Sequence, residues 1–335
     1  VIGQNLKYDI NVLKKYSMII KNRIEDTMLM SYVLSSNGKH DMDTISSKFL
    51  DHKPISYESV AGKGKDQISF ADVEISKAVE YACEDADLTF LLYQKLSTLL
   101  KKDKKLLKIY TEIEIKLMLI IADMEYIGVS LNNKELSKQS QNLAKRIDKI
   151  EKNIYKISGR EFNISSPKQI QEIFYDELKL PILKKTPKGQ PSTNEDVMSQ
   201  LAEDHELPNL VLSYRNLLKL KNTYTDKLGD QVSDISNRLH TSYNQTITIT
   251  GRLSSSSPNL QNIPIRTDDG KKIRSAFIPR EGYKLFSADY SQIELRIMAH
   301  LAKDPAMIES FLTGEDIHSS TARKVFNIKD EPSSD

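Results

Sequence analysis

The pattern that most constrains the fold lies between residues 134 and 157, where the sequence predicts one long amphipathic helix. Asn132 or Asn133 is the expected N-cap, and Gly159 is the expected stop. The apolar stripe of this helix has to be buried, so the middle of the chain is expected to be a block of packed helices. The stripe consists of Leu136, Leu143, Ile147, Ile150, Ile154 and Ile157.

Further helices are expected around this one, over residues 106–126 and 208–224, and starting near Ser166 and Thr193. Residues 101–160 carry 14 basic and 8 acidic side chains. Lysines on a helical arm can contact phosphates without reading sequence, although a solvated helix face is the commoner cause of such a run. A basic loop rich in glycine and proline interrupts the arm and carries Lys184, Lys185 and Lys188.

Composition narrows the classes of protein. The 335 residues are 39% hydrophobic and 28% charged, which is typical of a soluble protein with two or three domains. A single cysteine, Cys83, excludes an internal disulfide and a thiolate metal site. No apolar run reaches the ~20 residues of a membrane span, and no signal peptide is recognisable, so an intracellular protein is expected. The sequence opens with Val1-Ile-Gly-Gln, not Met, and we expect it to be part of a longer protein.

Residues 1–100 alternate short apolar runs with helical patterns, at residues 5–13, 26–34 and 80–92, as in an α/β domain that lacks its first strands. Tyr81 and Asp85 are four residues apart and therefore share one helix face. Taken alone, such a pair is more often helix surface than active site.

From His240 the period changes, and residues 243–250 and 274–278 are expected to be strands. Between them a serine loop carries Arg252, Asn259 and Gln261. Such side chains in rigid loops suit hydrogen bonding in a minor groove, while turn formation is the alternative.

Residues 283–288 are expected to form a strand that presents Asp289, followed by a turn and a helix with Ile293, Ile297 and Leu301 on one face. A carboxylate at a strand end suits a divalent metal that handles phosphate. The alternative is that Asp289 is a turn residue and that Ser291 and Glu294 form a capping box. Residues 305–312 and 317–326 are expected to be further helices.

Three motifs in order carry a resemblance to known families. Asn5-x-x-x-Asp9 and Tyr81-x-x-x-Asp85 resemble the second and third motifs of the 3′–5′ proofreading exonucleases. The loop from Thr250-Gly-Arg252 to Asn259-Leu-Gln261, followed by Asp289-Tyr-Ser-Gln292-Ile-Glu294, resembles motif A and its upstream loop in bacterial family A DNA polymerases. The resemblance runs through the whole chain.

The resemblance implies a multi-domain α/β and α+β protein. A partial ribonuclease H-like exonuclease domain would occupy residues 1–104, and a joining helix residues 105–130. A helical thumb would occupy residues 131–230, a partial α+β palm with motif A residues 231–303, and the start of the fingers residues 304–335. The exonuclease's Asp-x-Glu motif, most of the fingers and the C-terminal palm with the second catalytic aspartate would lie outside this chain. An internal fragment with both active sites incomplete is therefore expected.

The resemblance also implies residue roles. In the polymerase, Asp289 would be one of two catalytic aspartates that bind a pair of Mg²⁺ ions, and the Tyr290 carbonyl would complete the metal shell. Glu294 would exclude a 2′-hydroxyl. Gln292, Asp316 and His318 would contact the incoming nucleotide. Arg252, Asn259 and Gln261 would contact the primer–template minor groove, and the lysines of the arm would contact phosphates. In the exonuclease, Asp9 and Asp85 would hold metals, and Tyr81 would orient the attacking water.

The expected function is DNA-templated DNA synthesis with 3′–5′ proofreading in replication and repair. The expected partners are primer–template DNA and deoxynucleoside triphosphates, without a membrane. A monomer in the cytoplasm, associated with the nucleoid, is expected. Two alternatives stay open: a non-catalytic DNA-binding protein on the same scaffold, and a stand-alone 3′–5′ exonuclease, for which residues 240–326 would have no purpose.

Overall fold

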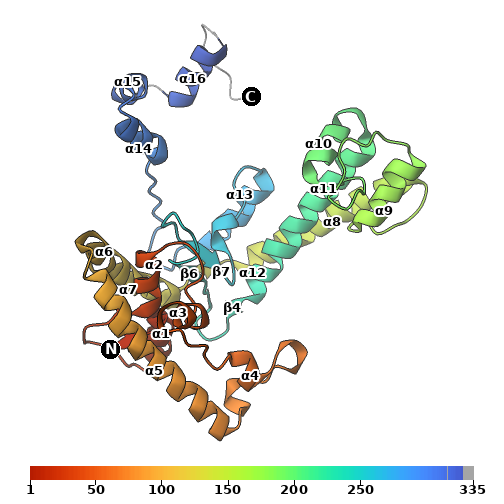
Figure 1. The fold of residues 1–335 in the computed structure, drawn as a ribbon. Coiled ribbons are helices and arrows are strands. Elements are labelled where there is room, and N and C mark those ends of the chain that lie inside the picture. The colour runs from red at the N-terminus through yellow and green to blue at the C-terminus, as the bar shows by residue number, and fades with distance from the viewer. Residues whose placement is uncertain (315, 327–335) are drawn as a thin grey trace. The chain divides into compact units, whose positions relative to one another are not determined.

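The computed structural model describes residues 1–314 and 316–326 and divides into two compact units, Val1–Glu281 and a second that begins at Gly282 (Figure 1). Helices dominate both units. Within the described residues, the strands are two or three residues long and pair in four two-stranded sheets. Strands this short add little stability, so packing between helices holds the first unit together.

The N-terminal part packs its helices on the long helix α5 (Ile75–Leu100). Every fourth residue of α5 from Leu88 to Leu100 is buried, and the last three of these leucines meet Leu29 and Ile45 in one core. Burying each such side chain contributes about 1.5–3 kcal/mol. The other elements are β1 (Ile2–Gly3), α1 (Leu6–Lys15), β2 (Glu25–Asp26), α2 (Thr27–Leu34), α3 (Met42–Leu50), α4 (Tyr57–Ala61) and the 3₁₀ turns η1 (Gly64–Asp66) and η2 (Phe70–Asp72).

The helix expected over residues 106–126 is interrupted. It consists of α6 (Lys104–Ile109), a π-helical turn η3 (Tyr110–Glu114) and α7 (Ile115–Ile127). Tyr110, in the wide turn, is buried; its hydroxyl donates to Glu25 Oε2 at 2.8 Å and accepts from Asp26 N at 3.0 Å. Gly128 ends α7 at φ 65°, where a Cβ would lie 2.7 Å from the Leu239 carbonyl oxygen, so only glycine fits.

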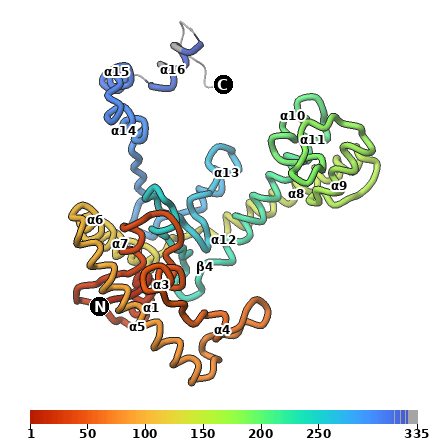
Figure 2. Tube along the Cα trace, in the orientation of Figure 1, coloured from red at the N-terminus to blue at the C-terminus, as the bar shows by residue number. Residues whose placement is uncertain are grey.

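The predicted arm is present. Its chain runs out along α8 (Asn133–Ser158) and returns along α11 (Glu206–Leu220), which packs beside α8 (Figure 2). Asn132 Oδ1 caps α8 by accepting from Glu135 N at 3.1 Å, and Gly159 ends the helix at φ 74°. The middle of the predicted stripe on α8 meets a core built around Phe174, Met198 and Val211. Its two ends differ, because Leu136 packs in a separate core and Ile157 is exposed where the helix ends. The remaining elements of the arm are α9 (Pro167–Gln171), η4 (Glu172–Glu177), α10 (Glu195–Asp204) and η5 (Lys221–Thr225).

The strand-rich part differs from the expectation in two places. Residues 246–250 form bends and a turn, with Ile247 and Ile249 exposed, and the strand ends at Asn244. Residues expected to be the strand 274–278 begin inside helix α13 (Asp268–Ser275), capped by Thr267, and only β8 (Phe277–Ile278) is extended. The other elements are α12 (Lys227–Asp230), β3 (Ser130–Leu131, paired with β8), β4 (Val232–Ser233) with β5 (Arg238–Leu239), β6 (Ser242–Asn244) with β7 (Ser254–Ser256), and η6 (Leu260–Asn262).

The second unit contains α14 (Ile293–Ala302), α15 (Pro305–Thr313) and α16 (Ile317–Phe326), as the sequence predicts. The strand expected at residues 283–288 is absent, and these side chains are exposed. A strand exists only when a neighbouring strand accepts its backbone hydrogen bonds. The described residues place no such neighbour beside 283–288.

Candidate functional site

Helix α5 presents Tyr81 and Asp85 together, as their spacing predicts. The Tyr81 hydroxyl and the Asp85 carboxylate lie one turn apart on this face and influence each other's pKa. Burial, followed by the charge of Asp85, raises the pKa of Tyr81 to about 12, so its hydroxyl remains a hydrogen-bond donor at neutral pH. Burial also raises the pKa of Asp85, and the interaction with Tyr81 partly offsets that rise. The pair can position a water molecule and a cation side by side.

Three neighbours of this pair were not singled out from the sequence. The rings of Phe70 and Tyr57 lie 5.8 Å and 6.2 Å from that of Tyr81, and the charge of Asp43 raises the pKa of both Tyr81 and Asp85. These residues come from η2, α4 and α3, so no helical spacing links them to Tyr81. Exposed aromatic residues next to a carboxylate were the available signal, since both Tyr57 and Phe70 are more than a third exposed.

Asp9 lies in the first turn of α1 and is exposed, although desolvation by its surroundings raises its pKa. The structure gives no contact that joins Asp9 to Asp85. Across residues 1–314 and 316–326, no group of three or more His, Cys, Asp or Glu side chains is arranged to hold a metal ion. Asp9 and Asp85 are thus separate carboxylates among the described residues, and their metal-binding role remains a prediction.

The loop that precedes η6 is held by its own polar side chains. Asn259 Oδ1 accepts from Gln261 N at 2.9 Å, and Gln261 Nε2 donates to the Leu253 carbonyl oxygen at 2.9 Å. Thr248 Oγ1 donates to the Arg252 carbonyl oxygen at 2.6 Å. The alternative interpretation as turn chemistry therefore describes part of what Asn259 and Gln261 do. A loop fixed in this way can also present the remaining polar groups rigidly.

The basic loop of the arm is an ordered, solvent-facing turn. Thr186 N donates to the Gln190 carbonyl oxygen at 2.7 Å, and Ser192 N to the Lys184 carbonyl oxygen at 2.8 Å. Lys184, Lys185 and Lys188 are all exposed. Their charges can reach a polyanion without desolvation of neighbouring protein groups.

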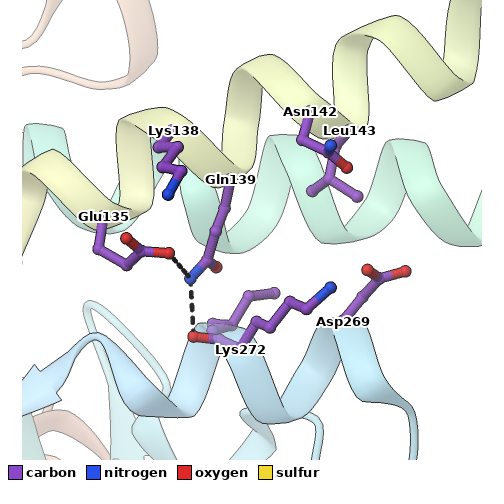
Figure 3. Close-up of a pocket in the computed structure, with 8 residues that line it drawn as sticks. Glu135, Lys138, Gln139, Asn142, Leu143, Asp269 and Lys272 are labelled. Carbon is purple, nitrogen blue, oxygen red and sulfur yellow. Dashed lines mark hydrogen bonds between the residues drawn. The ribbon is translucent and has the colours of Figure 1, made fainter.

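A groove of about 230 Å³ lies where α13 meets α8 (Figure 3). Gln139 spans it: its Nε2 donates to Glu135 Oε1 at 3.2 Å and to the Lys272 carbonyl oxygen at 2.8 Å. Arg146 Nη1 contacts both oxygens of Asp269 at 2.7 and 2.8 Å. None of the predicted site residues lines this groove, and its contacts fasten α13 to the base of the arm.

In the second unit, Asp289 and Tyr290 are exposed and precede α14. The alternative capping box is not formed, because the N-cap of α14 is Gln292, at φ 52° and without a side-chain capping bond. Glu294 lies exposed in the first turn of α14. Asp289 and the Tyr290 carbonyl offer the hard oxygen ligands that Mg²⁺ prefers.

Gln292 and Asp316 are brought together although 24 residues separate them. Gln292 Nε2 donates to Asp316 Oδ1 at 2.8 Å, and Asp316 Oδ2 accepts from Ser319 N and Oγ at 2.9 and 3.0 Å. The bond from Ser319 N, followed by that from Gln292, lowers the pKa of Asp316. His318 lies in the first turn of α16. Two predicted nucleotide-binding residues are thus hydrogen-bonded neighbours.

Two known protein-family models match this chain, one over its N-terminal segment and one over most of the rest. The model of DNA polymerase family A matches residues 133–335, and that of the 3′–5′ exonuclease matches residues 1–101. The chain belongs to DNA polymerase family A.

Within the described residues, no helix combines the length and apolar character needed to cross a membrane.

Named relatives agree with this assignment. DNA polymerase I of Pseudomonas aeruginosa is 48% identical over 331 residues, which cover 98% of this chain and 36% of that protein. DNA polymerase I of Rhizobium leguminosarum is 46% identical and is matched over 32% of its length and 98% of this chain. A solved structure, the POL domain of Pol1 from M. smegmatis in complex with DNA primer-template and dNTP, is 33% identical with a TM-score of 0.80, over 98% of this chain and 54% of that one.

The chain thus spans about a third of the length of these family A relatives. The predicted family and the predicted multi-domain fold class, with exonuclease and polymerase segments in that order, are confirmed. The domain boundaries and the roles of single residues remain predictions.

Proposed function

We propose that the full-length protein carrying this chain extends DNA primers on a template and removes mispaired 3′ ends, in DNA replication and repair. The observation that carries the proposal is the presence, in one chain, of the Tyr81–Asp85 pair on α5 and of Asp289 before α14, each inside a segment that matches the corresponding family. The solved relative at 33% identity is a complex with DNA primer-template and dNTP, which supports the same partners here.

For synthesis, Asp289 and the Tyr290 carbonyl are the proposed Mg²⁺ ligands of this chain, and their hard oxygen donors suit that ion. When bound, the metal lowers the pKa of the primer 3′-hydroxyl and neutralises charge on the α-phosphoryl group. Glu294 occupies the space of a 2′-hydroxyl and so selects deoxynucleotides. Gln292, Asp316 and His318 contact the incoming nucleotide, with Gln292 oriented by its 2.8 Å bond to Asp316.

Duplex DNA is held by two kinds of contact. Arg252, Asn259 and Gln261 face the minor groove from a loop that their own backbone bonds keep rigid. The exposed Lys184, Lys185 and Lys188 contact phosphates and set affinity without reading sequence.

For proofreading, Asp85 and Asp9 are the proposed Mg²⁺ ligands, and Tyr81 orients the attacking water. The Tyr81 hydroxyl is suited to this role because a protonated phenol can donate a hydrogen bond to the water, and its raised pKa leaves it still further from ionisation. The monomeric state and the cytoplasmic, nucleoid-associated location are part of the same proposal.

The proposal is tested with the full-length protein on two substrates. A primed template with all four dNTPs should be extended, and a primer with a mispaired 3′ end should be trimmed in the absence of dNTPs. A matched substrate with ribonucleotides tests Glu294: Glu294→Ala should raise ribonucleotide incorporation while leaving dNTP incorporation measurable. Binding of primed duplex without extension or trimming would instead identify a non-catalytic DNA-binding protein.

A further inference from the structure

Helix α1 fastens to α7 through one polar face. Lys7, Asn11 and Lys14 lie at helical spacing on that face. Lys7 Nζ bonds to Glu125 Oε1, Asn11 Nδ2 donates to Glu125 Oε2 at 3.0 Å, and Lys14 Nζ bonds to Asp123 Oδ1. All three polar side chains of α1 therefore contact two acidic residues of α7, Glu125 and Asp123.

The Lys7–Glu125 pair is buried, unlike most ion pairs. Its side chains are only 11% and 9% exposed, whereas Asp123, the partner of Lys14, is 67% exposed. Both groups have further partners, since Lys7 Nζ also donates to the Tyr243 carbonyl oxygen and Glu125 Oε1 also accepts from Tyr243 N at 2.6 Å. A buried pair saturated in this way holds one geometry, because any displacement leaves a charge without compensation.

The joint connects three segments of different origin. Lys7 belongs to the exonuclease match, Glu125 lies in α7 between the two matched segments, and Tyr243 in β6 belongs to the polymerase match. Tyr32 in α2 adds a second tie of the same kind, donating from its hydroxyl to the Thr248 carbonyl oxygen at 2.8 Å. The polymerase segment is therefore part of the support on which α1 rests.

Asp9 lies on the side of α1 opposite to this joint. It follows Lys7 by two residues and is therefore about 160° around the helix from it. The start of α1 is fixed separately, because Leu6 N donates to the buried Asp26 Oδ2 at 2.7 Å. Rotation of α1 about its axis is opposed by the burial of Leu6 and Ile10 and by the polar face on α7, in which Lys7 makes the most buried contact. A rotation of about 20° would move a carboxylate roughly 6 Å from the axis by about 2 Å.

We infer that Lys7, through its buried bond to Glu125 and Tyr243, is a positioning residue that sets the direction in which Asp9 points. This inference rests on the proposed role of Asp9 in proofreading. The polymerase segment then contributes structurally to the exonuclease site. Lys7 affects the trimming reaction without contacting the substrate or the metal ions. A site of this kind tolerates displacements of only about 0.5 Å.

The test uses the full-length protein with Lys7→Met, which keeps most of the side-chain volume and removes the charge. Trimming of a mispaired primer should slow by at least about tenfold, and the Mg²⁺ concentration for half-maximal trimming should rise, as for other groups that orient metal ligands. Primer extension on the same preparation should change by less than about twofold. Lys7→Arg, which keeps charge and donors, should recover part of the trimming rate. Lys15→Met, at an exposed position of the same helix, is the matched control.

Several outcomes would overturn the inference. Normal trimming with a normal Mg²⁺ response in Lys7→Met would do so. A parallel loss of trimming, extension and thermal stability, with an unchanged Mg²⁺ response, would reduce Lys7 to a structural support. If Lys7→Met does not fold, the double variant Lys7→Met/Glu125→Met removes both charges together, and it should fold, extend primers and still trim poorly; normal trimming there would also contradict the inference.

Failure of the proposed function gives a different result. If Asp9→Ala trims normally, the proposed role of Asp9 is wrong and Lys7 has nothing to position. If Asp9→Ala abolishes trimming while Lys7→Met trims normally, only the positioning inference fails.

Discussion

The exonuclease segment and the segment around Asp289 present their carboxylates by different means. Tyr81 and Asp85 meet because they are four residues apart on a helix whose leucines are buried every fourth residue. Asp289 follows residues 283–288, which are exposed and make no strand within the described residues. A helix closes its hydrogen bonds within itself, whereas a strand depends on a partner distant in the sequence. The first arrangement is fixed locally, whereas the second would need long-range pairing, which the described residues do not provide.

The largest expected effect separates the two regions by function. In the full-length protein, Asp289→Ala should slow nucleotide incorporation by about a thousandfold or more, because removing a metal ligand leaves the transferring charge without compensation. Trimming by the same variant should stay within a few-fold of normal. Asp85→Ala should give the reverse pattern, and single-turnover assays of both reactions measure it.

A matched control for this crossed pair is Asp87→Ala, an exposed acid on the same helix two residues from Asp85. It should leave both rates unchanged. Loss of both reactions in either Asp289→Ala or Asp85→Ala would show that the two regions are not independent, and normal incorporation in Asp289→Ala would remove the proposed metal role.

The same contrast explains what the sequence could predict. Periodicity located α8, α11 and α5, because an apolar stripe and its caps are local properties of the chain. Strands were predicted poorly: residues 246–250 have high β propensity yet form bends, and Arg274 belongs to a helix that Thr267 caps. Propensity states how a residue fits a sheet, but long-range pairing decides whether there is one.

The contacts of the candidate site residues also fall into local ones, which spacing predicts, and long-range ones, which it does not. The Tyr81–Asp85 contact followed from spacing alone. Asp43 and Phe70 reach the same place through separate elements, and Gln292 reaches Asp316 across 24 residues, so no local pattern contains these contacts. The groove lined by Gln139 could not be predicted from the sequence either, because α13, which forms one side of it, was not predicted.

A second, smaller effect tests how firmly the exonuclease segment is held, through the pH dependence of stability. Asp26 is fully buried and accepts from Leu6 N and Leu29 N at the starts of α1 and α2. Burial raises the pKa of Asp26 to about 6, against about 4 in an unfolded chain. The folded state therefore binds more protons between these values, and stability falls as pH rises from about 4 to 6, by on the order of 3 kcal/mol.

Asp26→Asn should flatten that part of the pH profile while keeping a side-chain oxygen that accepts one of the two backbone bonds. The measurement is urea unfolding followed by circular dichroism from pH 4.5 to 7, since the chain has no tryptophan to serve as a fluorescence probe. The difference between the wild type and Asp26→Asn isolates Asp26 from the other acids. Equal slopes for the two proteins would mean that Asp26 titrates normally in the fold.

The smallest expected effect concerns side chains that neither helix spacing nor strand pairing fixes in position. Lys184, Lys185 and Lys188 are exposed on the turn of the arm, so they should act through charge and not through a fixed geometry. Replacing all three by Gln should weaken binding of primed duplex about equally for every sequence and should reduce the slope of log K against log salt by about 1 for each lost phosphate contact. Thermal stability should not change, because exposed lysines contribute little to folding. The same replacement at the exposed Lys101, Lys102 and Lys104 removes equal charge elsewhere and should leave the slope as it was. If both triple variants lower the slope alike, net charge alone is responsible; if only the arm variant does, the duplex lies along the arm.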